Sequence, residues 1–446
     1  MDTYRAWIDQ HKEELIADLR RLLRQPSISA QDYGIRECAG LVAEMLEEWG
    51  IAAQIHETAR HPVVTGELEG RGDKTMLIYG HYDVQPPDPL ELWEHDPFGA
   101  EVVDGRIYAR GAVDDKGNML AAIEAVRGLK ELGQLPCRFK FIIEGEEEIS
   151  SPSLYPFVAE HRDLLEADAL AGFDGNVTPS GRPEVMLGMK GICYVEMSAE
   201  VGRDQHSSKA PLVPNPAWRL IWALNSLKGP DEQIKVPGFY DDVVPPTEQE
   251  LAALEQMEWN EEALRQAWGV ERFLSGRTGQ DARVALLFEP TCTVCGFEAG
   301  YTGPGAKTVL PGKARCKVDF RLVPRQDPHD IFRKVRAHLD AQGFSDVDLR
   351  LIGALKASKT PLDAPVAQAL IAALRDVFGV QPSVKPLVEG SGPGYIFEEL
   401  LQIPQVYSGF GPTEDRLHSP NEYITVEGYL RGIEACMRFY AVWATL

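Results

Sequence analysis

The chain has 446 residues, of which 44% are hydrophobic, and its formal net charge at pH 7 is −23. Such an acidic composition excludes the basic surface that nucleic acids and anionic membranes require of a binding protein. The length exceeds what one hydrophobic core usually serves, so two or three domains are expected.

The N-terminal segment, residues 1–29, has the apolar spacing of an amphipathic helix rather than of a signal peptide. No apolar run reaches the roughly 18 residues that a membrane span needs. The seven cysteines, spread from Cys38 to Cys436, are typical of reduced thiols rather than of a disulfide framework. We therefore expect a cytoplasmic protein.

The first half of the chain alternates strand-like apolar runs with a helical pattern. Strands are predicted over residues 74–81, 137–145 and 167–174, and a helix over residues 116–133. This alternation predicts an α/β fold with a mostly parallel sheet flanked by helices.

From about residue 191 the pattern changes to alternating strand-like runs, at residues 193–201 and 313–323, with a helix over 216–227 between them. These runs predict an antiparallel sheet with helices on one face, which is an α+β arrangement. Residues 240–262 are rich in proline and acidic side chains and are expected to form an exposed lobe or loop.

After residue 358, a helical pattern over residues 366–379 and a strand-like run over 403–410 restore the α/β pattern. The middle of the chain therefore looks inserted into the first domain. We predict a discontinuous domain of residues 1–190 and 355–446, and an inserted domain of residues 191–354.

Histidine or acidic residues follow five predicted strands or turns, and open α/β sheets bind ligands at the carboxyl ends of their strands. These residues are His81 and Asp83, Asp114 and Asp115, the glutamates within 144–148, Asp174, and His418. Together they would make a mixed nitrogen and oxygen shell for a metal ion. A cation would also offset the repulsion among so many neighbouring carboxylates.

Each of these residues also has an ordinary alternative role, and His81 could be a hydrogen-bonded loop histidine. Asp114 precedes a helix and could be its N-cap, and Asp174 precedes a glycine and could be a turn residue. The glutamates of residues 146–148 could form a solvated acidic loop.

The motifs resemble those of the metal-dependent exopeptidases and amidohydrolases that include carnosinase, cytosolic non-specific dipeptidase, glutamate carboxypeptidase and succinyl-diaminopimelate desuccinylase. The resemblance runs, in chain order, through PSIS, GHYDVQP, HDPF, DGRIYARGAVDDKG, EGEEEISSPSL, HSSKAP, FRLVP, EGSGP and HSPNE. It is closest to the dipeptidase branch, because Asp174 stands where many deacylases and carboxypeptidases of the family have glutamate.

The resemblance implies two divalent cations per chain, with zinc favoured and manganese or cobalt also suited to such a shell. The first would be held by His81, Asp114 and Asp174, and the second by Asp114, Glu148 and His418. Asp83 would orient the imidazole of His81. Glu147 would be the general base. A cis peptide bond between Asp114 and Asp115 is also implied.

A peptidase of this kind must recognise a free carboxylate. Arg321 is the best candidate, since a guanidinium can bind a carboxylate through two hydrogen bonds, although a surface salt bridge is the alternative. The resemblance assigns substrate binding to the glycine-rich loop that contains Ser391 and Gly392, which could otherwise be a plain turn.

The resemblance also makes residues 191–354 a lid and dimerisation domain, and the rest of the chain the catalytic domain. His206 would reach from the inserted domain of one subunit into the site of the other and polarise the substrate. The alternative for His206 is a core or loop histidine. A homodimer formed through the inserted domain follows.

We therefore expect hydrolysis of dipeptides, or of short peptides with a free C-terminal carboxylate, by a hydroxide held between two metal ions. One alternative on the same scaffold is a deacylase, desuccinylase or carboxypeptidase that acts on N-acyl amino acids. Another is a non-catalytic acidic protein that binds cations, but such a protein has no need of Glu147 beside a metal ligand or of Arg321.

Overall fold

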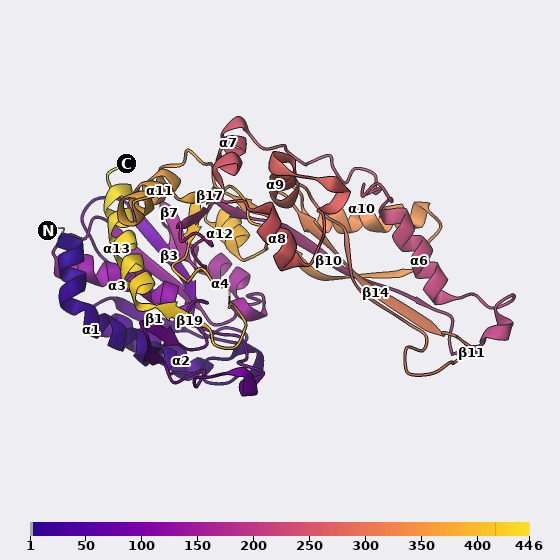
Figure 1. Cartoon of the computed structure of the whole chain (residues 1–446), viewed down its shortest axis with the longest axis horizontal. Coiled ribbons are helices and arrows are strands. Elements are labelled where there is room, and N and C mark those ends of the chain that lie inside the picture. The colour runs from indigo at the N-terminus through magenta and orange to yellow at the C-terminus, as the bar shows by residue number, and fades with distance from the viewer. Residues whose placement is uncertain (1–2, 415) are drawn as a thin grey trace.

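The chain forms an elongated molecule of two lobes, and its two ends lie in the same lobe (Figure 1). The structure is a computed structural model that describes residues 3–414 and 416–446. None of the helices within these two ranges has the length and apolar character that a membrane crossing requires.

An eight-stranded mixed sheet forms the centre of the lobe that holds both chain ends, in the order β1-β2-β6-β3-β7-β18-β8-β17. Its strands are β1 (Ala52–His56), β2 (Val63–Leu68), β3 (Thr75–His81), β6 (Arg138–Glu144), β7 (Ala169–Phe173), β8 (Glu184–Met186), β17 (Ser383–Lys385) and β18 (Gln405–Ser408). The central strands β6, β3, β7 and β18 are parallel to one another, so their carboxyl ends share one edge of the sheet. The predicted α/β fold with a mostly parallel sheet is confirmed.

Helices cover both faces of this sheet. One face packs against α1 (Thr3–Leu23), α2 (Ile35–Glu48), α3 (Lys116–Glu131), α11 (Pro365–Phe378) and α13 (Val426–Trp443), and the other against α4 (Leu154–Glu160) and α12 (Gly394–Leu400). Within β3, Met76 and Ile78 join the first core, whereas Leu77 and Tyr79 join the second. This division follows from the alternation of side chains along a strand, and it explains why β3 reads as one continuous apolar run.

The second lobe contains a four-stranded antiparallel sheet in the order β12-β14-β10-β15. Its strands are β10 (Gly191–Glu200), β12 (Thr293–Ala299), β14 (Lys313–Leu322) and β15 (Asp348–Leu355), and one face carries α6 (Pro216–Leu227) and α10 (Pro328–Ala341). Val318 and Phe320 of β14 are buried beneath these helices, so Asp319 and Arg321 point to the opposite face.

A short antiparallel ribbon lies where the chain passes between the two sheets. It pairs β9 (Gly188–Met189) on the outward pass with β16 (Ser358–Lys359) on the return. These positions lie next to the predicted domain boundaries, and the division of the chain at residues 190 and 355 stays a prediction.

The segment of residues 240–262 is largely exposed, as its composition suggested, but it is not a plain loop. It contains α7 (Glu248–Gln256) and the start of α8 (Glu261–Trp268), and α9 (Gly279–Phe288) follows. Thr247 and Glu250 form a capping box at the start of α7. Leu254 of α7 packs in one apolar cluster with Leu387, so this helix is tied to the first lobe beside β17.

Candidate active site

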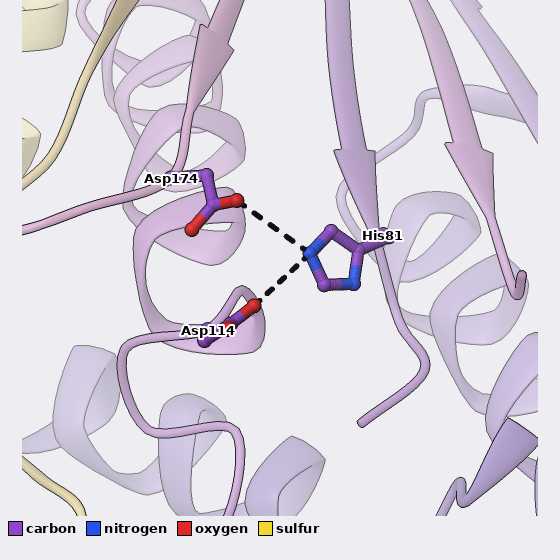
Figure 2. A group of neighbouring side chains, drawn as sticks. All are labelled: His81, Asp114 and Asp174. Carbon is purple, nitrogen blue, oxygen red and sulfur yellow. Dashed lines mark ion pairs between the residues drawn. The ribbon is translucent and has the colours of Figure 1, made fainter. Parts of the chain in front are cut away.

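The first group of candidate metal ligands lies where two parallel strands of the large sheet end. His81 is the last residue of β3, Asp174 directly follows β7, and Asp114 belongs to the loop before α3. Nε2 of His81 lies 3.2 Å from Oδ1 of Asp114 and 3.8 Å from Oδ2 of Asp174, as Figure 2 shows. Because β3 and β7 are adjacent and parallel, their carboxyl ends bring His81 and Asp174 together.

The second group shares Asp114 with the first. Nε2 of His418 lies 2.9 Å from Oδ2 of Asp114 and 3.3 Å from Oε2 of Glu148. Within each group the candidate ligand atoms all lie within 4.8 Å of one another. Asp114 therefore offers one carboxylate oxygen to each group, the arrangement that a ligand shared by two cations needs.

Two buried atoms of these groups suit a cation in particular. Within the described part of the chain, neither Nε2 of His81 nor Oε1 of Glu148 has a hydrogen-bond partner. A buried polar atom without a partner is costly. Imidazole nitrogens and carboxylate oxygens are ligands that zinc and related divalent metals accept, so the residues fit the metal that the sequence motifs imply.

The electrostatics of the site call for positive charge. Hydrogen bonds to Asp114 and Glu148 raise the pKa of His418 to about 10. Burial opposes protonation of His81, but the nearby carboxylates of Asp114, Asp174 and Asp83 outweigh it and raise its pKa well above the ordinary value. Bound cations would meet the same need for positive charge.

Two of the four crowded glutamates are structural. Glu144 is 1% exposed and Glu146 is 2% exposed, so the solvated acidic loop is excluded for both. Their carboxylates accept hydrogen bonds at 2.7–2.9 Å from Tyr79 and Ser151 for Glu144, and from His61 and Ser153 for Glu146. Fixed donors, rather than water, therefore offset the charge crowding at these two positions.

Asp83 holds the other two glutamates through their backbones. Its Oδ1 accepts a hydrogen bond from the N–H group of Glu147 at 3.2 Å, and its Oδ2 accepts one from the N–H group of Glu148 at 3.1 Å. The backbone carbonyl of Asp83 lies 3.1 Å from Nδ1 of His81, and its carboxylate lies 3.4 Å from the same atom. Asp83 is thus placed to orient the imidazole and also the turn that carries Glu147.

The side chain of Glu147 is free. Among residues 3–414 and 416–446 no hydrogen bond or ion pair holds its carboxyl group, although the charges of His81 and Asp174 act on it. Burial raises the pKa of Glu147 to about 8. An uncommitted carboxyl group beside both ligand groups is what a proton-transfer role requires.

The peptide bond between Asp114 and Asp115 is cis, as the sequence motifs imply. Oδ2 of Asp115 accepts a hydrogen bond from the backbone N–H of His81 at 3.2 Å. The residue after the shared ligand therefore contacts the strand end that supplies the first histidine.

Two of the predicted substrate-binding residues meet at the junction of the lobes. Nη1 of Arg321, from β14, donates a hydrogen bond to Oγ of Ser391 at 2.9 Å. At Gly392 an added Cβ atom would lie 2.7 Å from Sδ of Met189, so a side chain here would require Met189 to move. The substrate-binding roles of these residues stay predictions.

His206 does not join either ligand group within one chain. It belongs to β11 (Gln205–His206), which lies at the far end of the second lobe (Figure 1). The side chain is exposed, and its Nδ1 atom lies 2.8 Å from Oγ of Ser208. A core position is therefore excluded for His206, whereas its role in a second subunit stays a prediction.

Two polar residues of the site received no role from the sequence. Gln85 donates a hydrogen bond from Nε2 to Oε2 of Glu148 at 2.8 Å. Glu422 is buried beneath the loop that carries Asp114. The only sequence signal for a role at the site was that Gln85 lies in the motif GHYDVQP and Glu422 in the motif HSPNE.

Comparisons with known proteins agree with this site. The profile of Peptidase family M20/M25/M40 matches residues 77–441. A Beta-Ala-His dipeptidase of Homo sapiens is 33% identical, and the match covers 86% of this chain and 78% of that protein. A Cys-Gly metallodipeptidase of Schizosaccharomyces pombe is 28% identical, and the match covers 96% of this chain and 95% of that protein. The solved structure of an M20 family metallo-carboxypeptidase from Sulfolobus solfataricus is 38% identical, with a TM-score of 0.92, and covers 97% of this chain and 100% of that one.

Proposed function

This chain belongs to Peptidase family M20/M25/M40, and we propose that it is a metal-dependent dipeptidase. Its substrates are dipeptides, or short peptides with a free C-terminal carboxylate. The observation that carries this proposal is the pair of ligand groups that share Asp114, with the free carboxyl group of Glu147 beside them. His81 and Asp174 complete the first group, and Glu148 and His418 complete the second.

Two divalent cations in these groups would acidify the attacking water and polarise the scissile carbonyl. Glu147 accepts the proton of that water and returns it to the leaving nitrogen, which makes it the general base and then the general acid. Asp83 keeps Glu147 in place through the backbone hydrogen bond described above. The two neighbouring glutamates have different roles: Glu148 is a metal ligand, and Glu147 transfers the proton.

Arg321 binds the C-terminal carboxylate of the substrate. Its guanidinium group has five N–H donors, of which one is used by Ser391, and its ion pair with Asp319 is long at 3.9 Å. Arg321 is 35% exposed, so a carboxylate can reach it. Ser391 and Gly392 form the loop on the other side of this position.

The active form is a homodimer that pairs through the inserted domain. Trp218, Ile221 and Trp222 of α6 are each exposed by 41–54% and form an apolar stripe on the second lobe. Exposed apolar faces of this kind are typical of interfaces between protein surfaces. In such a dimer His206, at the far end of that lobe, completes the site of the partner subunit and polarises the substrate carbonyl.

A second candidate function is that of a carboxypeptidase or deacylase acting on N-acyl amino acids. It is favoured by the 38% identity to the metallo-carboxypeptidase from Sulfolobus solfataricus. Asp174 favours the dipeptidase, because the glutamate typical of the deacylases and carboxypeptidases is absent from that position.

A substrate panel decides between the two functions. Protein loaded with zinc, manganese or cobalt is assayed on free dipeptides and on N-acyl amino acids. A dipeptidase hydrolyses the free dipeptides and discriminates against the N-acyl amino acids, whereas the second candidate function shows the opposite preference. A chelator should abolish the activity, and elemental analysis should find about two divalent ions per chain. Full activity in metal-free protein would contradict both functions.

A further inference from the structure

Glu422 lies at the centre of a buried polar cluster next to the second ligand group. It is 1% exposed and comes four residues after His418 in the sequence. Its Oε2 accepts hydrogen bonds from Nη1 of Arg110 at 2.7 Å and from N–H of Gly111 at 3.1 Å. Its Oε1 accepts hydrogen bonds from N–H of Val113 at 2.8 Å and from N–H of Asp114 at 3.3 Å.

The main chain around Glu422 is paired with the same loop. Its carbonyl oxygen accepts a hydrogen bond from N–H of Ala109 at 3.1 Å. The next residues form β19 (Tyr423–Thr425), which pairs antiparallel with β5 (Arg106–Tyr108). Residues 422–425, which follow His418, are thus bonded to residues 106–109, which precede Asp114.

We propose that Glu422 is a positioning residue that holds Asp114 and His418 at the spacing required by the cation of the second group. This inference rests on the metal centre of the proposed function and adds a residue that touches neither metal nor substrate. Four donors around one carboxylate leave the loop little freedom to move. Because the cluster lies directly behind Asp114, a change at Glu422 displaces a ligand that both cations share.

The chemistry of the pair with Arg110 makes the inference testable. Arg110 is 1% exposed, so Glu422→Gln leaves a buried guanidinium without its countercharge, and this alone destabilises a protein. The amide nitrogen of glutamine also cannot accept the hydrogen bonds that one of the two carboxylate oxygens accepts now. The double variant Arg110→Met/Glu422→Gln removes the unpaired positive charge. It still leaves part of the loop's backbone N–H groups without a hydrogen-bond acceptor.

The experiment measures the binding of Zn²⁺ to metal-free protein by competition with a chromophoric chelator, beside the thermal unfolding of each variant. We expect two equivalents for the wild-type chain, and a loss of 10-fold to 100-fold in zinc affinity in Glu422→Gln, the usual effect of losing a partner of a metal ligand. The double variant should regain thermal stability over Glu422→Gln and keep the weak zinc binding. If Glu422→Gln does not fold, the double variant alone answers the question.

Glu250→Gln is the matched control. Glu250 is also buried, at 5% exposure, accepts a hydrogen bond from Nζ of Lys359 at 2.6 Å, and accepts one from the backbone N–H of Thr247 at 2.7 Å. This variant should lose stability and keep wild-type zinc binding. Wild-type zinc affinity in the double variant overturns the positioning role of Glu422 while the proposed function stands. Absence of zinc binding in the wild-type chain overturns both.

Discussion

Arg321 and Ser391 are joined by a hydrogen bond of 2.9 Å, from Nη1 of the guanidinium group to the serine hydroxyl, although 70 residues separate them in the sequence. Arg321 comes from the antiparallel sheet of the second lobe, and Ser391 lies in the loop before α12 of the first lobe. A substrate carboxylate bound here, as proposed above, would contact both lobes at once.

The first prediction concerns substrate recognition by this arginine. Arg321→Met should raise KM for free dipeptides by about 10-fold to 100-fold, because a charge-assisted hydrogen bond of this kind is worth roughly 1.5–3 kcal/mol. The same variant should act on C-terminally amidated dipeptides as the wild-type chain does. Steady-state kinetics on matched acid and amide substrates would measure the difference. Arg315→Met, on the same face of β14, is a control that should leave KM for the acid and the amide substrates unchanged.

The second prediction distinguishes the role of Glu147 from the role of Glu148. Glu147→Gln should keep its metal content and lose about 10²-fold to 10⁴-fold in kcat, the usual contribution of general-base catalysis. Glu148→Gln should instead bind metal more weakly, because it replaces a charged ligand with a neutral one. Elemental analysis and kcat are measured on the same preparations. A Glu147→Gln chain with near wild-type kcat would show that another group takes the proton.

Much of the first lobe could be predicted because its central strands are buried on both faces. The strand expected at residues 74–81 is β3 (Thr75–His81), and the helix expected at residues 116–133 is α3 (Lys116–Glu131). A continuous apolar run that stops at a histidine or an aspartate marks both the strand and its carboxyl end. The parallel pairing of such strands then brings their terminal residues to one place without further information.

The remaining parts of the site depend on contacts that no local pattern contains. Arg110 and Glu422 are 312 positions apart, and each resembles an ordinary charged residue until β5 and β19 pair. The helix α7 is a different case, because Thr247 and Glu250 have the spacing of a capping box. The capping-box spacing could have predicted the start of this helix, but the surrounding prolines and acidic residues favoured the prediction of a loop.

The third prediction tests the structural role of Glu146. Glu146→Ala leaves the N–H groups of His61 and Ser153 without their acceptor, and a buried group without a partner costs about 1–3 kcal/mol. The variant should therefore be destabilised by roughly 2–6 kcal/mol, measured by denaturant unfolding of metal-free protein. Glu160→Ala, at an exposed position of α4, should change stability by less than about 0.5 kcal/mol. Equal stability of the two variants would show that the hydrogen bonds of Glu146 do not stabilise the fold.

The last prediction is that His206 acts in the site of the partner subunit. A chain with His206→Ala and a chain with Glu147→Gln should each be nearly inactive alone, and mixing them should restore activity. In a mixed dimer the site with an intact Glu147 receives the intact His206 from its partner, while the other site lacks both. Random exchange gives mixed dimers in about half of the population, so about a quarter of wild-type activity is expected. If His206 served its own chain, every site in the mixture would still lack one group. Subunit exchange is verified with differently tagged chains, and an inactive mixture after complete exchange would refute the shared site.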